Sequence, residues 1–134
     1  MADRYVLDAH TLIWYIEDNP RLGVNTRIIM DDPGSSLYLP IIALAEGCHI
    51  VGRGRTSIAS IAALLTDVDA DPRIAIVSLN RAILDLSLTL TAITEMHDRL
   101  IAATTLYLAN ADETVALLTC DSNITASGLV PTLW

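Results

Sequence analysis

The sequence predicts an α/β fold, a three-layer α/β/α arrangement around a mostly parallel central sheet. Short apolar runs rich in β-branched residues alternate with longer segments of helical periodicity along the whole chain. The run at 114–120 is apolar without alternation, which is typical of a strand buried on both faces. With 134 residues, 52% of them hydrophobic, we expect a single domain over residues 1–134 with a core of ordinary size.

Each expected element is bounded by recognisable start and stop signals. The expected strands cover 5–7, 37–39, 74–79, 114–120 and an edge strand within 130–134, which Pro131 interrupts. The expected helices cover 9–17, 25–32, a segment starting after Pro40, 56–66, 80–90 and 98–111, with a short turn at 122–127. The inward faces are expected to carry Ile41, Leu44, Ala45 and Cys48 in the third helix, and Ile58, Ile61, Ala62 and Leu65 in the fourth. Residues 67–72 are expected to form an acidic, solvated loop.

The charge balance excludes several functions. The formal net charge is −8, and the eight basic residues are all arginine, which argues against a broad basic face for nucleic acid. Contact with phosphates through divalent cations and a few arginines stays open. A P-loop requires lysine, and the Gly52–Arg55 segment lacks both the third glycine and the preceding strand of a dinucleotide fingerprint.

We expect a cytoplasmic protein that does not enter a membrane. The first residues lack a signal-peptide layout, and no apolar run approaches the ~20 residues of a membrane span. Cys48 and Cys120 do not have zinc-ligand spacing, so the simplest interpretation is a pair of buried thiols in a reducing compartment.

Four carboxylates occupy positions that suggest a site. Asp8 and Asp121 each follow a predicted buried strand, and parallel strands end at the same sheet edge. Asp98 at a helix entrance and Glu46 within a helix could reach the same crevice. Gathered carboxylates require cations or raised pKa values, and an all-oxygen set suits Mg²⁺ or Mn²⁺. The alternative is that the aspartates cap helices and that Glu46 is solvated.

These residues together resemble the PIN domain, and within it the VapC-type toxins of bacterial toxin–antitoxin pairs. The resemblance is carried by the segment 5–10 around Asp8, by Glu46, by Met96–Thr104 and by Leu118–Asp121. It covers almost the whole chain, and the helix motif around Asp98 is its most specific part. It implies an α/β/α fold and a metal-dependent endoribonuclease that leaves a 5′-phosphate.

The resemblance also implies roles for residues and partners. Asp8, Glu46, Asp98 and Asp121 correspond to an acidic quartet that binds one or two Mg²⁺ or Mn²⁺ ions. Thr119 matches a supporting hydroxyl, and His10 matches one subgroup's start motif. Many members have a further acid shortly after the last aspartate, where this chain has Ser122 and Asn123. The implied partners are an RNA substrate, an antitoxin protein whose arginine enters the acidic pocket, and a second copy in a homodimer.

Other polar and aromatic residues are assigned more ordinary roles. Arg53, Arg55 and Arg99 are candidates for RNA contact, although solvation, or for Arg99 a pair with an acid, is the commoner arrangement. His49 and His97 are expected to pack or to support the site, because hard cations seldom choose imidazole. Trp14 and Tyr107 are expected in the core, with a dimer or antitoxin surface as the alternative for Trp14.

Two other functions stay open from the sequence. A phosphoacceptor receiver domain also clusters acids at strand ends, but its chemistry uses a lysine that this chain lacks. A PIN-like protein-interaction module with weak or lost catalysis is the second alternative, since no acid follows shortly after Asp121.

Overall fold

The protein folds around a five-stranded, wholly parallel sheet with the strand order β3-β2-β1-β4-β5. The computed structural model describes residues 3–109 and 114–134. The strands are β1 (Arg4–Leu7), β2 (Ser36–Pro40), β3 (Ile74–Val77), β4 (Val115–Leu118) and β5 (Thr132–Leu133). The helices are α1 (Ala9–Ile16), α2 (Val24–Asp31), α3 (Ile41–Gly52), α4 (Ile61–Ala70), α5 (Arg81–Ser87), α6 (Met96–Leu108) and α7 (Ser122–Ser127).

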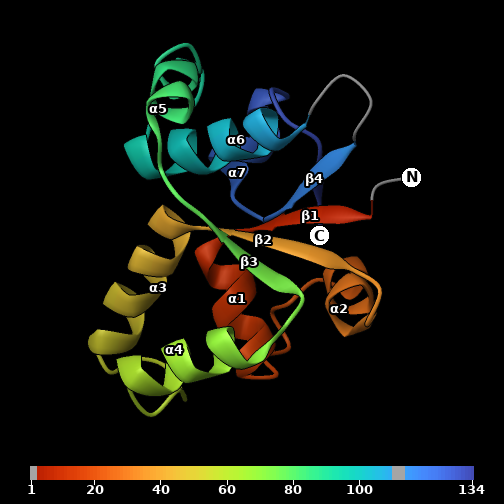
Figure 1. Ribbon diagram of the computed structural model, residues 1–134, viewed down its shortest axis with the longest axis vertical. Helices are drawn as coiled ribbons and strands as arrows, with labels where there is room; N and C mark the ends of the chain where they lie inside the picture. Colours follow the sequence, from red (N-terminus) through yellow and green to blue (C-terminus); the bar gives the residue numbers. More distant parts are fainter. Residues whose placement is uncertain (1–2, 110–113) are drawn as a thin grey trace.

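Helices cover both faces of the sheet, which confirms the predicted three-layer α/β/α class. In Figure 1, α5, α6 and α7 lie on one side of the strands, and α1 to α4 lie on the other. The central strands β1 and β4 are therefore buried on both faces, with Val6, Leu7, Leu117 and Leu118 fully inaccessible. None of the helices in the described ranges is both long and apolar enough to cross a membrane.

In four of these helices, the side chain of the residue before the first turn caps the helix. Asp8 caps α1, Ser60 caps α4, Asn80 caps α5 and Asp121 caps α7, each by accepting from a backbone N–H of the first turn. Gly128, with φ of 65°, ends α7 in the left-handed region that glycine tolerates.

The fourth helix differs from the prediction in both its start and its end. It spans 61–70 instead of 56–66, because the Ser60 hydroxyl caps it and Glu17 Oε2 accepts from the N–H and hydroxyl of Ser57, which keeps the preceding segment extended. The expected acidic loop is therefore mostly helix. Asp71 is not solvated either, since it pairs with Arg73 at 2.9 Å and its pKa is lowered mainly by that guanidinium.

The inward faces of α3 and α4 are rotated from the predicted ones. The buried residues are Ala43, Leu44, Gly47 and Val51 in α3, and Leu64 and Val68 in α4. Ile41, Ile61 and Leu65 are exposed instead. Leu44 is buried as predicted, and because α3 packs against both α1 and α6, the small residues Ala43 and Gly47 take further contact positions in that helix.

Several other boundaries and burial expectations are also corrected. Strand β3 stops at Val77, and helix α6 begins at Met96 and ends at Leu108, while the expected end at 111 falls outside the described residues. Tyr107 was expected in the core but is 43% exposed, and Cys120 is exposed while Cys48 is half-buried. The edge position of 130–134 and the short helix at 122–127 are confirmed.

Candidate active site

The candidate site lies at the topological switch point of the sheet. From β1 the chain builds β2 and β3 on one side, while β4 and β5 lie on the other side. β1 and β4 are parallel neighbours, with Leu7 opposite Leu118. The residues that follow them, Asp8 and Thr119, therefore emerge side by side, in the crevice where open α/β sheets place their ligands.

Asp8 is a buried carboxylate held by two hydrogen bonds. Its Oδ1 accepts from the backbone N–H of Ala9 at 2.7 Å, and its Oδ2 accepts from the hydroxyl of Thr119 at 2.6 Å. The pKa of Asp8 is raised above its usual value chiefly by burial, and the bond from Thr119 opposes that rise. Asp8 and Thr119 are 111 residues apart in the sequence, so this bond ties the two central strands together.

Thr119 also positions the last aspartate of the quartet. Its Oγ1 accepts from the backbone N–H of Asp121 at 3.1 Å. The Oδ1 of Asp121 in turn accepts from the N–H groups of Asn123 and Ile124 at 2.8 and 3.2 Å. Thr119 thus touches both strand-end acids, the supporting place that the sequence assigned to it. Asn123 contributes its backbone, and its side chain is exposed.

Asp98 and Glu46 reach the same crevice from α6 and α3. Burial, then Asp121 and Asp8, raise the pKa of Asp98 from 3.8 to about 7. Burial and Asp8 raise the pKa of Glu46. Asp8, Asp121 and Glu46 all lie near enough to Asp98 for their charges to disfavour its ionisation, and Asp8 lies near enough to Glu46 to do the same. The structure therefore brings the sequence-predicted quartet into one place.

The helix-cap alternative is true for two of the acids and does not hold for the third. Asp8 and Asp121 do cap α1 and α7. Asp98 lies inside the first turn of α6, where Glu95 occupies the cap position without a side-chain cap bond. Capping and membership of the cluster are compatible, because an ionised carboxylate has about four lone-pair sites and a hydrogen bond occupies only one of them.

Sequence reasoning missed a fifth acid, Glu95. This exposed residue at the entrance of α6 raises the pKa values of both Glu46 and Asp98, so it lies near the cluster. A further acid was predicted only after Asp121, where none occurs nearby, whereas Glu95 comes three residues before Asp98. The signal was available in the Glu95–Asp98 spacing, which places two acids on adjacent turns of a helix start.

The donor set fits a divalent cation. Among the described residues, Glu46 Oε1 and Asp98 Oδ2 are buried atoms without a hydrogen-bond partner. Such orphaned carboxylate oxygens, among other acids that disfavour their ionisation, are what a hard cation with oxygen ligands would satisfy. In the described part of the chain, no group of three or more His, Cys, Asp or Glu side chains is arranged so that it could hold a metal ion. The carboxylates would have to draw in around an ion.

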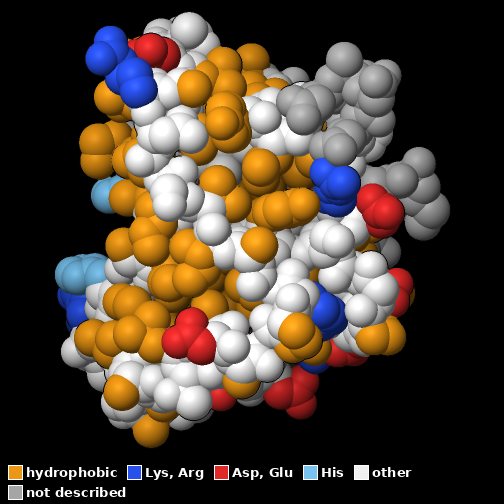
Figure 2. Space-filling model, in the orientation of Figure 1, with side chains coloured by type: hydrophobic (Ala, Val, Ile, Leu, Met, Phe, Trp, Pro, Cys, Tyr) orange, Lys and Arg blue, Asp and Glu red, His pale blue; other side chains and the backbone are white. Residues whose placement is uncertain are grey.

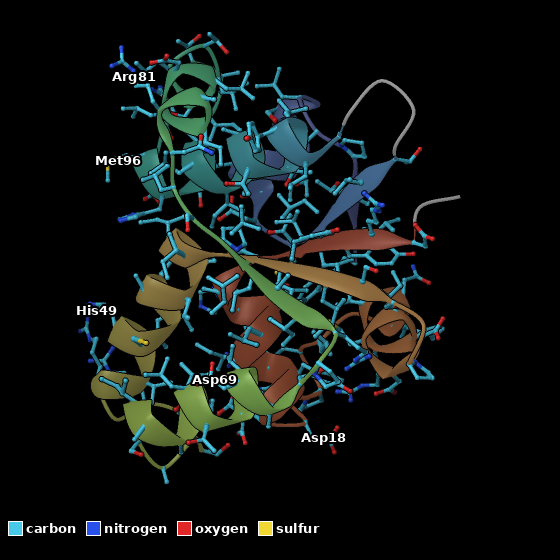
Figure 3. The ribbon with its side chains drawn as sticks, in the orientation of Figure 1. Asp18, His49, Asp69, Arg81 and Met96 are labelled. Carbon is cyan, nitrogen blue, oxygen red and sulfur yellow. The ribbon has the colours of Figure 1, made fainter. Side chains whose placement is uncertain are left out.

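The histidines and arginines are distributed around the acids. His10 is exposed beside Asp8, and His97 lies near enough to Glu46 to oppose the rise in its pKa. His49 points outward from α3 (Figure 3). Arg99 donates from Nε to the backbone oxygen of Ile93, so the expected pair with an acid is not what holds its guanidinium.

The two arginines after α3 lie at different places. Arg53 caps the end of α3 and is exposed. Arg55 lines a cavity of about 440 Å³ together with Arg21, His10 and Trp14. Arg21 was not singled out from the sequence. Trp14 was expected in the core, but it is half-buried and lines two cavities, both of which also include His10.

Comparison with known proteins identifies the family. Residues 5–126 match the PIN domain. The fold is similar to those of VapBC-1 from nontypeable Haemophilus influenzae (TM-score 0.68, 17% identity, covering 97% of this chain and 96% of that one) and FitAcB from Neisseria gonorrhoeae (0.66, 16%, 97% and 96%). A third similar structure is VapBC2 from Rickettsia felis bound to a DNA fragment from their promoter (0.67, 16%, 97% of each chain).

No curated protein sequence matches the chain. Because the family match spans most of the 134 residues, the resemblance drawn from the segments around Asp8, Asp98 and Asp121 is confirmed at the level of the family. The chain belongs to the PIN domain family, whose members are generally nucleases.

Proposed function

We propose that this protein is a Mg²⁺- or Mn²⁺-dependent endoribonuclease and the toxin of a toxin–antitoxin pair. The observation that carries the proposal is the carboxylate cluster at the switch point of a PIN fold, in which buried oxygens of Glu46 and Asp98 have no hydrogen-bond partner. Buried, unpaired carboxylate oxygens are costly for folding alone, so a role in binding a cation accounts for their presence.

Asp8, Asp98, Asp121 and Glu46 would hold the metal. A bound ion of this kind neutralises the carboxylates and supplies Lewis-acid activation of a phosphodiester and of water. The chain's own contribution is to keep the oxygens in place: Thr119 fixes Oδ2 of Asp8 and the backbone of Asp121, and the first turn of α7 fixes Oδ1 of Asp121.

The proposed partners are an antitoxin protein and a second copy of the chain. The three similar solved structures are VapBC and FitAcB assemblies, which supports an antitoxin partner, and a carboxylate cleft suits an inserted arginine.

For the homodimer, support comes from large exposed apolar side chains near the β3 edge: Ile76, Leu79, Leu84, Leu88 and Met96. Figure 2 shows hydrophobic side chains gathered on this face. We also propose that residues 1–134 act as a single domain.

The decisive variant is Asp121→Asn, because asparagine caps a helix as well as aspartate does. It therefore removes the charge and keeps the start of α7. Purified wild-type protein is expected to cleave single-stranded and structured RNAs with Mn²⁺ and to stop in EDTA. Asp121→Asn is expected to lose cleavage while keeping its unfolding midpoint, and Asp69→Asn on the exposed face of α4 serves as the charge-matched control (Figure 3).

Equal cleavage by wild type and Asp121→Asn would contradict the assignment of the site. A protein that binds no Mn²⁺ at millimolar concentration and cleaves no RNA would instead be a PIN-like interaction module, the second function that the sequence left open.

A further inference from the structure

A second feature adjoins the acids, namely an aromatic pocket of about 230 Å³. It shares Asp8 and Asp121 with the carboxylate cluster, and its other walls include Trp14, Trp134 and His10. Its volume is several times the roughly 30 Å³ that one water molecule occupies in the liquid. A ligand in this pocket would therefore lie next to whatever the acids hold.

The two tryptophan rings of this pocket are held in place by contacts with each other and with neighbouring residues. Trp14 and Trp134 meet edge to face, with ring centroids 5.8 Å apart and an interplanar angle of 66°, and His10 lies 5.3 Å from Trp14. Trp134 packs so closely on Gly23 that a Cβ there would lie 2.7 Å from the indole Cγ. Asn25 Nδ2 donates to the backbone oxygen of Trp134 at 3.0 Å, which holds the end of β5 in place.

Two arginines line a second cavity, which shares His10 and Trp14 with the aromatic pocket. The charged residues that line the neighbouring cavity are Arg21, Arg55 and Glu17, and the Oε2 of Glu17 accepts hydrogen bonds from Ser57. The guanidinium carbon of Arg21 is 5.9 Å from the centre of the Trp14 ring. Two of the eight arginines of a chain with a net charge of −8 therefore meet beside this pocket. In this neighbouring cavity two guanidinium groups face a single carboxylate, which favours a nucleic acid strand over the basic side chain of a protein partner as the occupant of the cavity.

We propose that Trp14 and Trp134 form a nucleobase subsite that holds an unstacked base of a single-stranded RNA next to the phosphodiester at the acids. The Arg21–Arg55 cavity then receives a neighbouring phosphate of the same strand. The physical basis is that RNA-binding proteins take up splayed bases by stacking on aromatic side chains, with arginines along the backbone. This subsite rests on the proposed ribonuclease function, which it makes selective for unpaired RNA.

Binding can be measured without cleavage, because both tryptophans of the chain line this pocket. Intrinsic tryptophan fluorescence of the full chain in EDTA is titrated with adenosine, and with ribose as the probe that lacks the base. We expect adenosine to quench the emission and ribose to leave it unchanged. Trp14→Leu is expected to bind adenosine at least about tenfold more weakly. Tyr107→Leu removes an exposed aromatic side chain near the far end of α6 and should not change the affinity.

The exposed thiol of Cys120 offers a second readout that needs no variant. Cys120 lines the same pocket, whereas Cys48 lies on α3 and serves as the internal control. Adenosine should slow alkylation of Cys120 by iodoacetamide and leave Cys48 unaffected. This measurement keeps the proposal testable if Trp14→Leu does not fold.

Three results would overturn the subsite: equal responses to adenosine and ribose, unchanged adenosine affinity in folded Trp14→Leu, or no protection of Cys120. Quenching by N-acetylarginine amide but not by adenosine would also overturn it and would assign the pocket to a protein partner. None of these readouts depends on metal or on cleavage. Adenosine binding without ribonuclease activity would therefore contradict the proposed function while the base-binding pocket stands.

Discussion

At the scale of single residues, the site depends on a few carboxyl groups whose surroundings disfavour their ionised form. Asp98 illustrates this, because burial and neighbouring acids raise its pKa to about 7. A carboxyl group that is protonated in the folded protein and ionised in the unfolded chain favours folding at low pH. This contribution is fully present below pH ~3.8 and is lost as the pH rises through about 7.

Asp98→Asn is therefore expected to raise the stability of the metal-free protein at pH 8, and to raise it less at pH 5. The measurement is the unfolding midpoint in EDTA at the two pH values. With Mn²⁺ present the order should reverse, since only the wild-type carboxylate contributes to binding the ion. Asp69→Asn, on the exposed face of α4, controls for the change in net charge. A pH-independent difference between wild type and Asp98→Asn would contradict the electrostatic account.

Thr119 provides a second test at this scale. Thr119→Val removes the hydroxyl that donates to Asp8, which leaves a buried carboxylate oxygen without that partner. We expect a loss of about 1–3 kcal/mol in the free energy of unfolding and a weaker affinity for Mn²⁺. Urea denaturation and Mn²⁺ titration measure the two effects, and Thr119→Ser should recover most of both.

Thr105→Val is the matched control for Thr119→Val. Its buried hydroxyl donates only to the carbonyl of Ile101, one turn earlier in α6. The control should leave Mn²⁺ affinity unchanged, and a loss of affinity equal to that of Thr119→Val would show that the effect is not specific to the site.

At the scale of elements, two glycines show how closely the helices approach their neighbours. Gly47 lies on the buried face of α3, where a Cβ would be 3.7 Å from Leu64 and 4.0 Å from Ile13, both ordinary contacts. Gly23 starts α2 with a φ of −61°, which any residue adopts, but a Cβ there would overlap Trp134. The same substitution should therefore have opposite effects at the two positions.

Gly47→Ala is expected to stabilise the protein by about 0.5–1 kcal/mol, because alanine loses less backbone entropy in a helix. Gly23→Ala is expected to destabilise it by about 1–3 kcal/mol and to displace Trp134. Urea denaturation gives the stabilities, and a red-shifted tryptophan emission reports the displacement. Unchanged emission in Gly23→Ala would mean that Trp134 is not held against α2.

The elements whose ends were mispredicted share one physical cause. The start of α4 depends on Ser60 and on the contact between Ser57 and Glu17, which are 40 residues apart. Local periodicity predicts the burial of the central strands, because their apolar runs do not alternate. Local periodicity does not specify which face of α3 is buried, because that helix contacts α1, α4 and α6 at once.

At the scale of the whole molecule, the exposed apolar face along the β3 edge predicts self-association. Leu88 and Met96 are each 62% exposed on this face, and Met96 projects from the outer end of α6 (Figure 3). Introducing a charge there should separate the proposed homodimer, since an unpaired buried charge is costly in an interface. We expect Leu88→Glu to convert a dimer into a monomer, as measured by light scattering coupled to size-exclusion chromatography.

Ile28→Glu is the control, because Ile28 is 64% exposed on α2, away from α5 in Figure 1. It should not change the mass in solution. A wild-type protein that is already monomeric, or a dimer that persists in Leu88→Glu, would contradict the assignment of this face.

The sequence by itself determined the parallel α/β/α architecture and the family, because both depend on local patterns. Apolar runs without alternation predicted buried strands, and the segments around Asp8, Asp98 and Asp121 carried the resemblance. The strand-end position of two acids followed from the same pattern, since parallel strands must end at one edge.

Only the tertiary structure decided which side chains surround those acids. The contact of Thr119 with Asp8, the nearness of Glu95, and the meeting of Trp14 with Trp134 each depend on how segments far apart in the chain pack together. From the sequence, Glu46 cannot be distinguished from a solvated helix residue. The packing of α3 against α6 brings it near the other acids. The physical reason is that burial and electrostatic neighbours are properties of packed surfaces, which periodicity along one segment cannot specify.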